Sequence, residues 1–79
     1  MNFSFSKPAI YQIEVLGELP PDLHGIFGNM DISTKTEEAT SPTTLLTGKI
    51  SDQTALAGIL SALYESHITL INLKKLKDL

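Results

Sequence analysis

The chain has no cysteine and no arginine among its 79 residues. Without cysteine, it can form neither disulfides nor thiolate metal sites. Arginine supplies the bidentate fork that binds phosphates and guanine edges, so its absence weighs against nucleic-acid recognition. No apolar run approaches the roughly 20 residues of a membrane span, and residues 1–7 lack the regions of a signal peptide. We therefore expect a soluble cytoplasmic protein that binds neither nucleic acid nor membrane.

The charge is distributed unevenly. Residues 1–73 contain three lysines and eight acidic residues, whereas Lys74, Lys75 and Lys77 follow close together. An acidic body repels a polyanion. Three lysines without interleaved aromatic residues more often solubilise a tail than bind a lipid surface.

The length predicts one domain, near the size at which a single hydrophobic core is only marginally sufficient. Small domains without disulfides or metals often gain stability from oligomerisation. We expect a flexible arm over residues 1–8, one α+β domain over residues 9–76, and a C-terminal tail over residues 77–79.

Four segments have the patterns of strands. From residue 9 the pattern changes, and Tyr11, Ile13 and Val15 alternate with Gln12 and Glu14, as in a half-buried strand. Residues 30–35 alternate in the same way, and residues 43–50 are rich in threonine and aliphatic side chains. These two segments predict a hairpin with an exposed loop between them. Residues 68–73 are apolar on both faces, which predicts a strand that is central in the sheet or covered twice.

The clearest element is an amphipathic helix from about Asp52 to Ser66, which Ser51 or Asp52 can cap. One apolar stripe at helical spacing predicts the face that packs on the sheet; it consists of Leu56, Ile59, Leu60, Leu63 and Tyr64. A second row is small and consists of Ala55, Gly58 and Ala62. Glycine inside a helix costs about 1 kcal/mol against alanine, and close approach of another backbone is one reason to tolerate it.

Together these segments predict a β-β-β-α-β fold, in which one helix covers one face of a four-stranded, mostly antiparallel sheet. The crossover through the helix should be right-handed and make strand four run parallel to strand three. The order of the strands stays open. Residues 21–28, after a pair of prolines, predict a short helical turn or loop whose Leu23, Ile26 and Phe27 pack over one end of the sheet.

The side chains that could perform chemistry form no motif. His24 and His67 are far apart in the sequence, and no H-x-x-x-H, H-E-x-x-H or C-x-x-C is present. A catalytic or metal-binding pair would need both histidines beside a carboxylate. We therefore expect a loop histidine and a helix-end histidine, with no enzymatic activity, metal or cofactor. Gly48 indicates a bulge or a close backbone approach within its strand.

Residues 14–29, EVLGELPPDLHGIFGN, resemble the N-terminal strand of carotenoid-cleaving oxygenases, which carry a similar G-E-L-P-P-D-L-x-G stretch. Those enzymes are long β-propellers that hold iron with four histidines. This chain has two histidines, so the likeness implies nothing catalytic.

A second likeness covers residues 11–76. Residues 11–19 fit a pattern Y-x-I-x-V-x-G-x-L, and residues 44–60 fit T-x-L-x-G-x-L-x-D-Q-x-A-L-x-G-L-L, with Ile50 and Ile59 at two leucine positions. On these residues the chain resembles a widespread family of small uncharacterised bacterial proteins with no established activity. The family often has histidine where Ala57 stands, so no role for that histidine transfers. The resemblance implies the fold and leaves the function open.

Two function classes follow. The first is a non-enzymatic homo-oligomeric module, a dimer or larger assembly, that acts in protein–protein interaction or regulation. Its interface candidates are the small helix row and the apolar fourth strand: Ala55, Gly58, Ala62, Thr69, Ile71 and Leu73. The alternative is a small-ligand binding or catalytic module, with a site near residues 23–28 and His24 as its titratable group.

Overall fold

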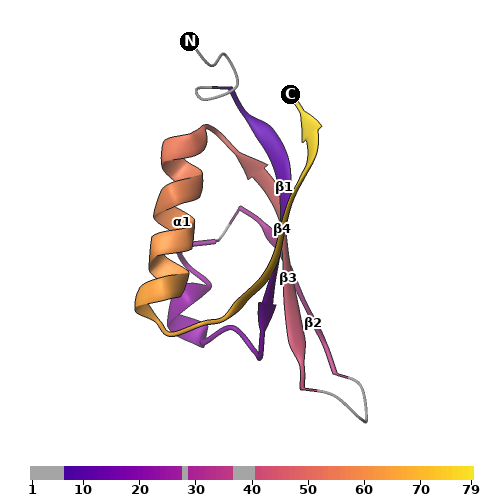
Figure 1. Ribbon diagram of the computed structural model, residues 1–79, viewed down its shortest axis with the longest axis vertical. Coiled ribbons are helices and arrows are strands. Elements are labelled where there is room, and N and C mark those ends of the chain that lie inside the picture. Colours follow the sequence, from indigo (N-terminus) through magenta and orange to yellow (C-terminus); the bar gives the residue numbers. More distant parts are fainter. Residues whose placement is uncertain (1–6, 28, 37–40) are drawn as a thin grey trace.

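The computed structural model of the chain describes residues 7–27, 29–36 and 41–79. These residues form β1 (Ala9–Leu16), a 3-10 turn η2 (Pro21–Leu23), β2 (Asp31–Lys35), β3 (Thr43–Ile50), α1 (Gln53–Glu65) and β4 (Leu70–Asp78). The four strands make one sheet of order β2-β3-β1-β4, and α1 covers one of its faces (Figure 1). The predicted α+β fold is confirmed.

β1 is one of the two inner strands of the sheet, beside β3. It pairs with β3 on one side, from Ala9 opposite Ile50 to Leu16 opposite Thr43, and with β4 on the other. Both pairings are antiparallel, so β3 and β4 run in the same direction, as predicted, with β1 between them. The sequence left this order open.

β2 and β3 form the predicted hairpin, from Asp31 opposite Thr47 to Lys35 opposite Thr43. Four residues of the loop predicted between them, 37–40, lie outside the described residues, as do residues 1–6 of the predicted arm. A Cβ atom on Gly48 would lie 3.1 Å from the Cα atom of Met30. The predicted close approach of a second backbone is therefore present at Gly48.

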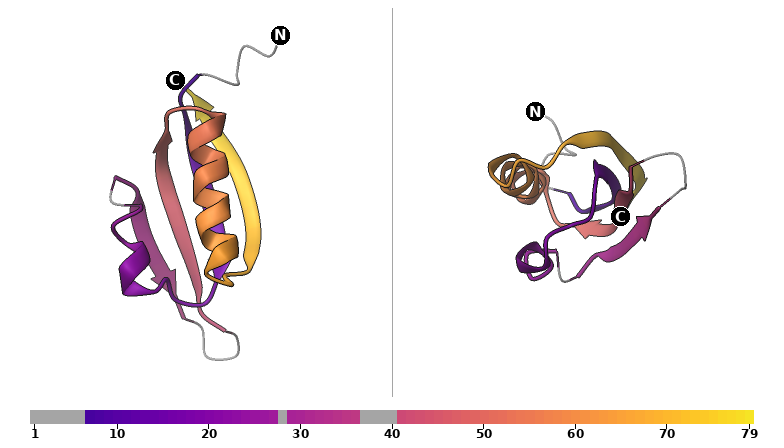
Figure 2. Two further views of the ribbon diagram at one scale, coloured as in Figure 1. Left: turned by 90° about the vertical axis from the view of Figure 1, so that its left-hand side faces the viewer. Right: turned by 90° about the horizontal axis from the view of Figure 1, so that it is seen from below.

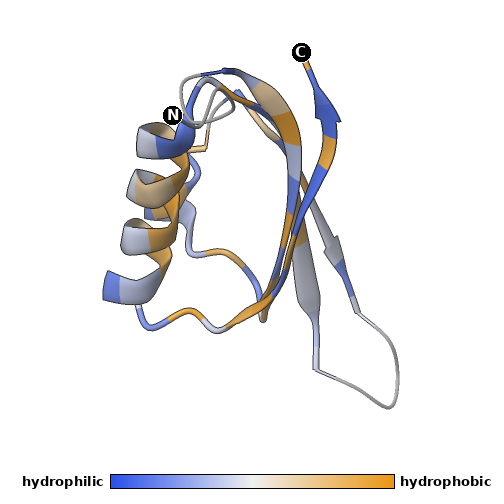
Figure 3. Ribbon diagram, turned by 45° about the horizontal axis from the view of Figure 1, so that its top comes forward, coloured by the Kyte–Doolittle hydropathy of each residue, from blue (hydrophilic) through white to orange (hydrophobic). Residues whose placement is uncertain are grey.

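The core lies between the sheet and α1, and the apolar side of the helix faces the strands (Figure 3). Its largest fully buried apolar side chains come from four parts of the chain: Phe27, Ile13, Leu46, Leu63 and Val15. Leu23 and Phe27 are buried, as predicted for the segment around η2. Ile26 was predicted to be buried with them, but it is 53% exposed because it lines a groove at the surface.

α1 begins at the predicted cap. The Asp52 carboxylate accepts a hydrogen bond from the Ala55 N–H at 2.8 Å, which satisfies one of the free amides of the first turn. Leu56 and Leu63 are buried, whereas Tyr64 is 82% exposed and its predicted place in the core is wrong. Tyr64 follows Leu56 by eight positions. Because each residue of a helix turns the chain by about 100°, the Tyr64 side chain points about 80° away from the direction of Leu56.

β4 differs most from its prediction. It extends to Asp78, so Lys74, Lys75 and Lys77 belong to the strand and not to a solvated extension. Two shifts in its register with β1, next to Ile71 and Leu76, are β-bulges. β4 was expected to be central or covered twice, but it is an edge strand whose nine residues are all exposed. β1 and β3 are the two strands that pair on both sides, whereas β4 pairs with β1 alone.

Candidate functional site

Exposed apolar side chains gather along β4. Five large apolar residues of β4 and the position after it expose between 37% and 52% of their surface; they are Leu70, Ile71, Leu73, Leu76 and Leu79. Leu16 is also exposed, and it lies beside the start of this strand, since its N–H donates to the carbonyl of Thr69 just before β4. Apolar residues scattered singly over a surface are ordinary, but contiguous ones mark interaction sites.

An apolar crevice lies beside this strand, between the second half of α1 and the start of β4. Its volume is about 260 Å³, and it is lined by Leu60, Leu63, Tyr64, Ile68 and Leu70. Because Leu70 belongs to both the crevice and the strand, the two are continuous. We call the crevice together with residues 70–79 the β4 surface.

β4 also presents a free hydrogen-bonding edge. One side of the strand is bonded to β1, and no described strand pairs with the other side (Figure 2). Unpaired N–H and C=O groups on an edge can template the addition of another strand. Lysines and bulges protect natural edges against indiscriminate pairing, and β4 has three lysines and two bulges. These features restrict which strand can pair with β4, and in which register.

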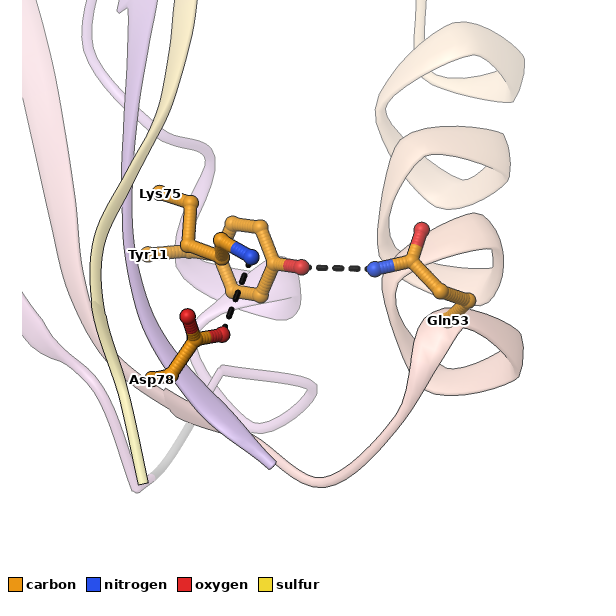
Figure 4. A network of polar contacts seen from close by, with 4 residues as sticks. All are labelled: Tyr11, Gln53, Lys75 and Asp78. Atoms are coloured by element: carbon orange, nitrogen blue, oxygen red, sulfur yellow. Dashed lines mark hydrogen bonds and ion pairs between the residues drawn. The ribbon is translucent and has the colours of Figure 1, made fainter. Parts of the chain in front are cut away.

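A polar cluster joins β1, β4 and the first turn of α1 (Figure 4). The side-chain amide of Gln53 donates to the hydroxyl of buried Tyr11 at 2.6 Å. Lys75 lies opposite Tyr11 in the sheet and forms an ion pair with Asp78 at 2.9 Å. The hydrogen bond from Lys75 to the Asp78 carboxylate raises the pKa of the lysine. The hydrogen bond from Gln53 to Tyr11 holds the start of the helix to β1, and the ion pair lies within β4.

Comparison with protein families gives a match over residues 10–74, to a domain of unknown function. The matched region contains β1 apart from Ala9, then β2, β3, α1 and the first half of β4. The chain belongs to the DUF8691 family. This agrees with the predicted membership of an uncharacterised family. Comparisons with curated proteins and with solved structures give no match.

In this DUF8691 domain, the six predicted interface residues divide between two places. Thr69, Ile71 and Leu73 are exposed on β4 or directly before it. Ala55 and Gly58 line a different groove beside the first half of α1, and Ala62 is half-buried further along the helix. The small helix row and the fourth strand therefore do not form one surface.

Sequence reasoning missed several members of the β4 surface, namely Tyr64, Leu70, Leu76 and Leu79. A signal for three of them was present, because leucine recurs at every third position from residue 70 to residue 79. A period of three fits neither a regular strand nor a helix. The two bulges of β4 each add a residue to the strand, and this is why leucines at a spacing of three can all belong to one strand.

The histidines of the DUF8691 domain lie outside both the crevice and the groove. His24 is exposed, with its Nε2 atom 3.4 Å from the carbonyl oxygen of Leu19. His67 is exposed after α1, with a φ of 59°. Within the described residues, no group of three His, Cys, Asp or Glu side chains is placed to hold a metal ion. In the same part of the chain, no helix is long and apolar enough to cross a membrane.

Proposed function

We propose that this DUF8691 domain is a non-enzymatic protein–protein interaction module that pairs with a second copy of itself through the β4 surface. The observation that carries the proposal is an open edge strand of nine exposed residues with large apolar side chains. Addition of a partner strand completes the backbone hydrogen bonds of this edge and removes apolar surface from water. The small size of the domain favours the same conclusion, since a chain of 79 residues buries a limited core.

Symmetry restricts the register of the pairing. When two copies of β4 pair antiparallel in one continuous sheet, a two-fold axis passes through the sheet and the residue on the axis lies opposite itself. An axis at Lys74 or Lys75 sets a lysine against the same lysine, and like charges placed directly opposite destabilise a sheet. An axis at Leu76 sets Lys75 against Lys77.

An axis at Leu73 avoids all of these charge pairs. Axes at Ile71 or Asn72 also avoid them, but they pair a shorter length of the strand. With the axis at Leu73, residues 70–76 of the two copies lie side by side, and Leu70 of one copy lies opposite Leu76 of the other. The Leu76 side chain of the second copy then lies next to the crevice, whose lining includes Leu70.

Cysteine cross-linking tests this arrangement directly. In Leu73→Cys, the new thiol is the only one in the chain. Directly opposite Cβ atoms in an antiparallel pair lie about 4.5–5.5 Å apart, and a disulfide spans about 3.5–4.5 Å, so a small shift of the paired strands brings the two thiols into bonding distance. We expect mild oxidation at micromolar concentration to convert most of Leu73→Cys into a covalent dimer of twice 8.6 kDa on a non-reducing gel.

Thr69→Cys is the matched control, because Thr69 is also exposed at the same edge. With the axis at Leu73, the two copies of residue 69 are eight positions apart along the strands, roughly 26 Å at 3.3 Å per residue. This variant should stay monomeric on the gel. Equal cross-linking of the two variants, or a wild-type chain that sediments as a monomer throughout the micromolar range, would contradict the proposal.

A further inference from the structure

The sheet has a second face, opposite α1, that no described helix or strand covers (Figure 1). We call it the open face. In β1, every second residue from Ala9 to Val15 is buried on the helix side, so Ile10 and Gln12 belong to the open face. Residues directly opposite each other in neighbouring strands share a face. The register of the sheet therefore shows which side chains lie beside Ile10 and Gln12.

The register brings three lysines together at one end of the open face. Lys77 of β4 and Lys49 of β3 both lie opposite Ile10, one on each side of it. Lys74 lies opposite Gln12, in the next row. Neighbouring strands are about 4.8 Å apart and a step of two residues along a strand is about 6.6 Å, so the three Cα atoms lie within about 12 Å of one another. We call Lys49, Lys74 and Lys77 the lysine patch.

The charge of the lysine patch is unpaired. Lys75 belongs to the other face, because it lies opposite buried Tyr11, and it forms its ion pair with Asp78. The three lysines of the patch are exposed, and none of them forms an ion pair in the part of the chain that the structure describes. The chain has nine acidic residues and six lysines, so carboxylates are not scarce. Half of the lysines of an acidic chain therefore gather where no described carboxylate pairs with them.

The borders of the patch indicate the length of a partner. Glu14 follows Gln12 on the open face of β1, and Asp31 ends the row that contains Gln12 and Lys74. A long polyanion would extend over these carboxylates and be repelled by them. A short segment with a few carboxylates fits between them, and each lysine ammonium can pair with a carboxylate as a compact point charge.

The composition of the open face separates the lysine patch from nucleic-acid and lipid sites. Single-stranded nucleic acids stack their bases on aromatic side chains, and the open-face positions of the four described strands carry no aromatic residue. Basic segments that bind anionic lipids contain about four to eight lysines or arginines, more than the patch contains.

We propose that the lysine patch binds a short acidic segment of a partner protein, with a carboxylate at each lysine. An extended segment places alternate side chains about 6.6 Å apart on one side, which matches the step between the two rows of the patch. The site is independent of the pairing through β4, because the lysines project from the face of the sheet and the pairing uses its edge. With the two-fold axis at Leu73, the open faces of both copies lie on one side of a continuous sheet, so the patch stays accessible.

Titration of the full ¹⁵N-labelled chain with acetylated and amidated hexaglutamate tests the site. The peptide and the chain both carry net negative charge at pH 7, so their association reports on the local positive charge. We expect saturating amide shifts at Ile10, Thr47 and Lys49, with a dissociation constant on the order of 1 mM at low salt, because exposed ion pairs are individually weak. Salt at about 0.5 M should screen these pairs and weaken the binding. No saturable shifts up to about 10 mM peptide, or shifts mainly outside the open face, would overturn the proposal.

Two double variants with the same change in net charge localise the site. Lys49→Gln/Lys77→Gln should weaken hexaglutamate binding about tenfold, since it removes both lysines beside Ile10. Lys35→Gln/Lys75→Gln should leave the binding within about twofold of the wild type, because Lys35 lies at the far end of the open face and Lys75 on the other face. Equal weakening by the two variants would overturn the proposal, because net charge alone would then explain the binding.

Other anions test the class of partner. A six-nucleotide thymidine strand, and vesicles of equal parts phosphatidylserine and phosphatidylcholine, should bind more weakly than hexaglutamate at the same concentration of negative charge. A strand or a vesicle that binds as tightly as hexaglutamate would overturn the assignment to an acidic protein segment.

Sedimentation separates this proposal from the pairing through β4. Lys49→Gln/Lys77→Gln should sediment as the wild type does and keep its circular dichroism spectrum, because both side chains are exposed and Lys77 lies outside the paired residues 70–76. A wild-type chain that binds hexaglutamate as a monomer would support the lysine patch and contradict the pairing. A dimeric wild-type chain that does not bind hexaglutamate would do the reverse.

Discussion

Replacing Leu73 by glutamate should dissociate the proposed dimer and leave each chain folded. Leu73 lies on the two-fold axis of the proposed pairing, so the substitution places two carboxylates opposite each other. In a single chain, the same residue is on an edge strand and is 37% exposed. The variant therefore separates assembly from folding.

The cost to folding is small. Burying a whole leucine side chain contributes about 1.5–3 kcal/mol, and about two-thirds of Leu73 is buried in one chain. The substitution therefore removes at most about 1–2 kcal/mol from the free energy of unfolding. At roughly 0.05–0.15 kcal/mol per residue, a domain of 79 residues has about 4–12 kcal/mol, so it stays folded.

The cost to the dimer is larger. Two unit charges about 5 Å apart repel each other by about 3 kcal/mol at an effective dielectric constant of 20. This energy weakens the dimer about 100-fold, because each 1.4 kcal/mol changes the dissociation constant tenfold. Leu73→Lys should weaken it more than Leu73→Glu does, because the new charge then adds to those of Lys74 and Lys75.

Sedimentation equilibrium over a range of concentrations measures these effects, with circular dichroism melting as the control for folding. Each variant alone should sediment near 8.6 kDa at a concentration where the wild type is dimeric. An equimolar mixture of Leu73→Glu and Leu73→Lys should recover the dimer, because glutamate then lies opposite lysine. A mixture that associates no better than either variant alone would refute the register at Leu73. A folded Leu73→Glu chain that remains dimeric would refute pairing through β4.

Two further predictions concern the fold. Asp52→Ala should lower the free energy of unfolding by about 1 kcal/mol, because it removes the acceptor for the Ala55 N–H, whereas Asp52→Asn should cost far less; thermal melting of the two variants checks this difference. Gly48→Ala should destabilise the domain by about 1–3 kcal/mol, since its new Cβ atom would press on the backbone at Met30. Gly25→Ala is the control, because a Cβ atom at Gly25 meets nothing within 4 Å, and equal urea midpoints for the two alanine variants would contradict the packing at Gly48.

Local patterns were sufficient to predict most elements. Alternation in residues 11–15 and helical spacing after Asp52 show which face of each segment can be buried, and burial of that face then selects strand or helix. The same reasoning failed at Tyr64, where eight residues of helical rotation carry the side chain out of the core. It failed again at β4, where apolar residues on both faces predicted a central or doubly covered strand, whereas β4 is an edge strand with two bulges.

The candidate surface could be predicted only in part. Ile71 and Leu73 were identified from their apolar character, and they are exposed on β4. Ala55 and Gly58 were grouped with them, but they line the groove on the other side of the helix. A row of small residues indicates that another group can approach that side of the helix closely. The row does not indicate which strand, loop or molecule lies there.

The sequence by itself determined the identity of the strands and the helix, because each depends on a few neighbouring residues. It narrowed the helix cap to Ser51 or Asp52, and the role of Gly48 to a bulge or a close backbone approach. Only the tertiary structure decided that β1 is an inner strand and β4 is an edge. Both strands are apolar enough for an inner place, and the choice rests on pairing between segments more than 50 residues apart. Such long-range pairing leaves no periodic signal in the sequence. It is also what exposes the β4 surface, and with it the proposed site of assembly.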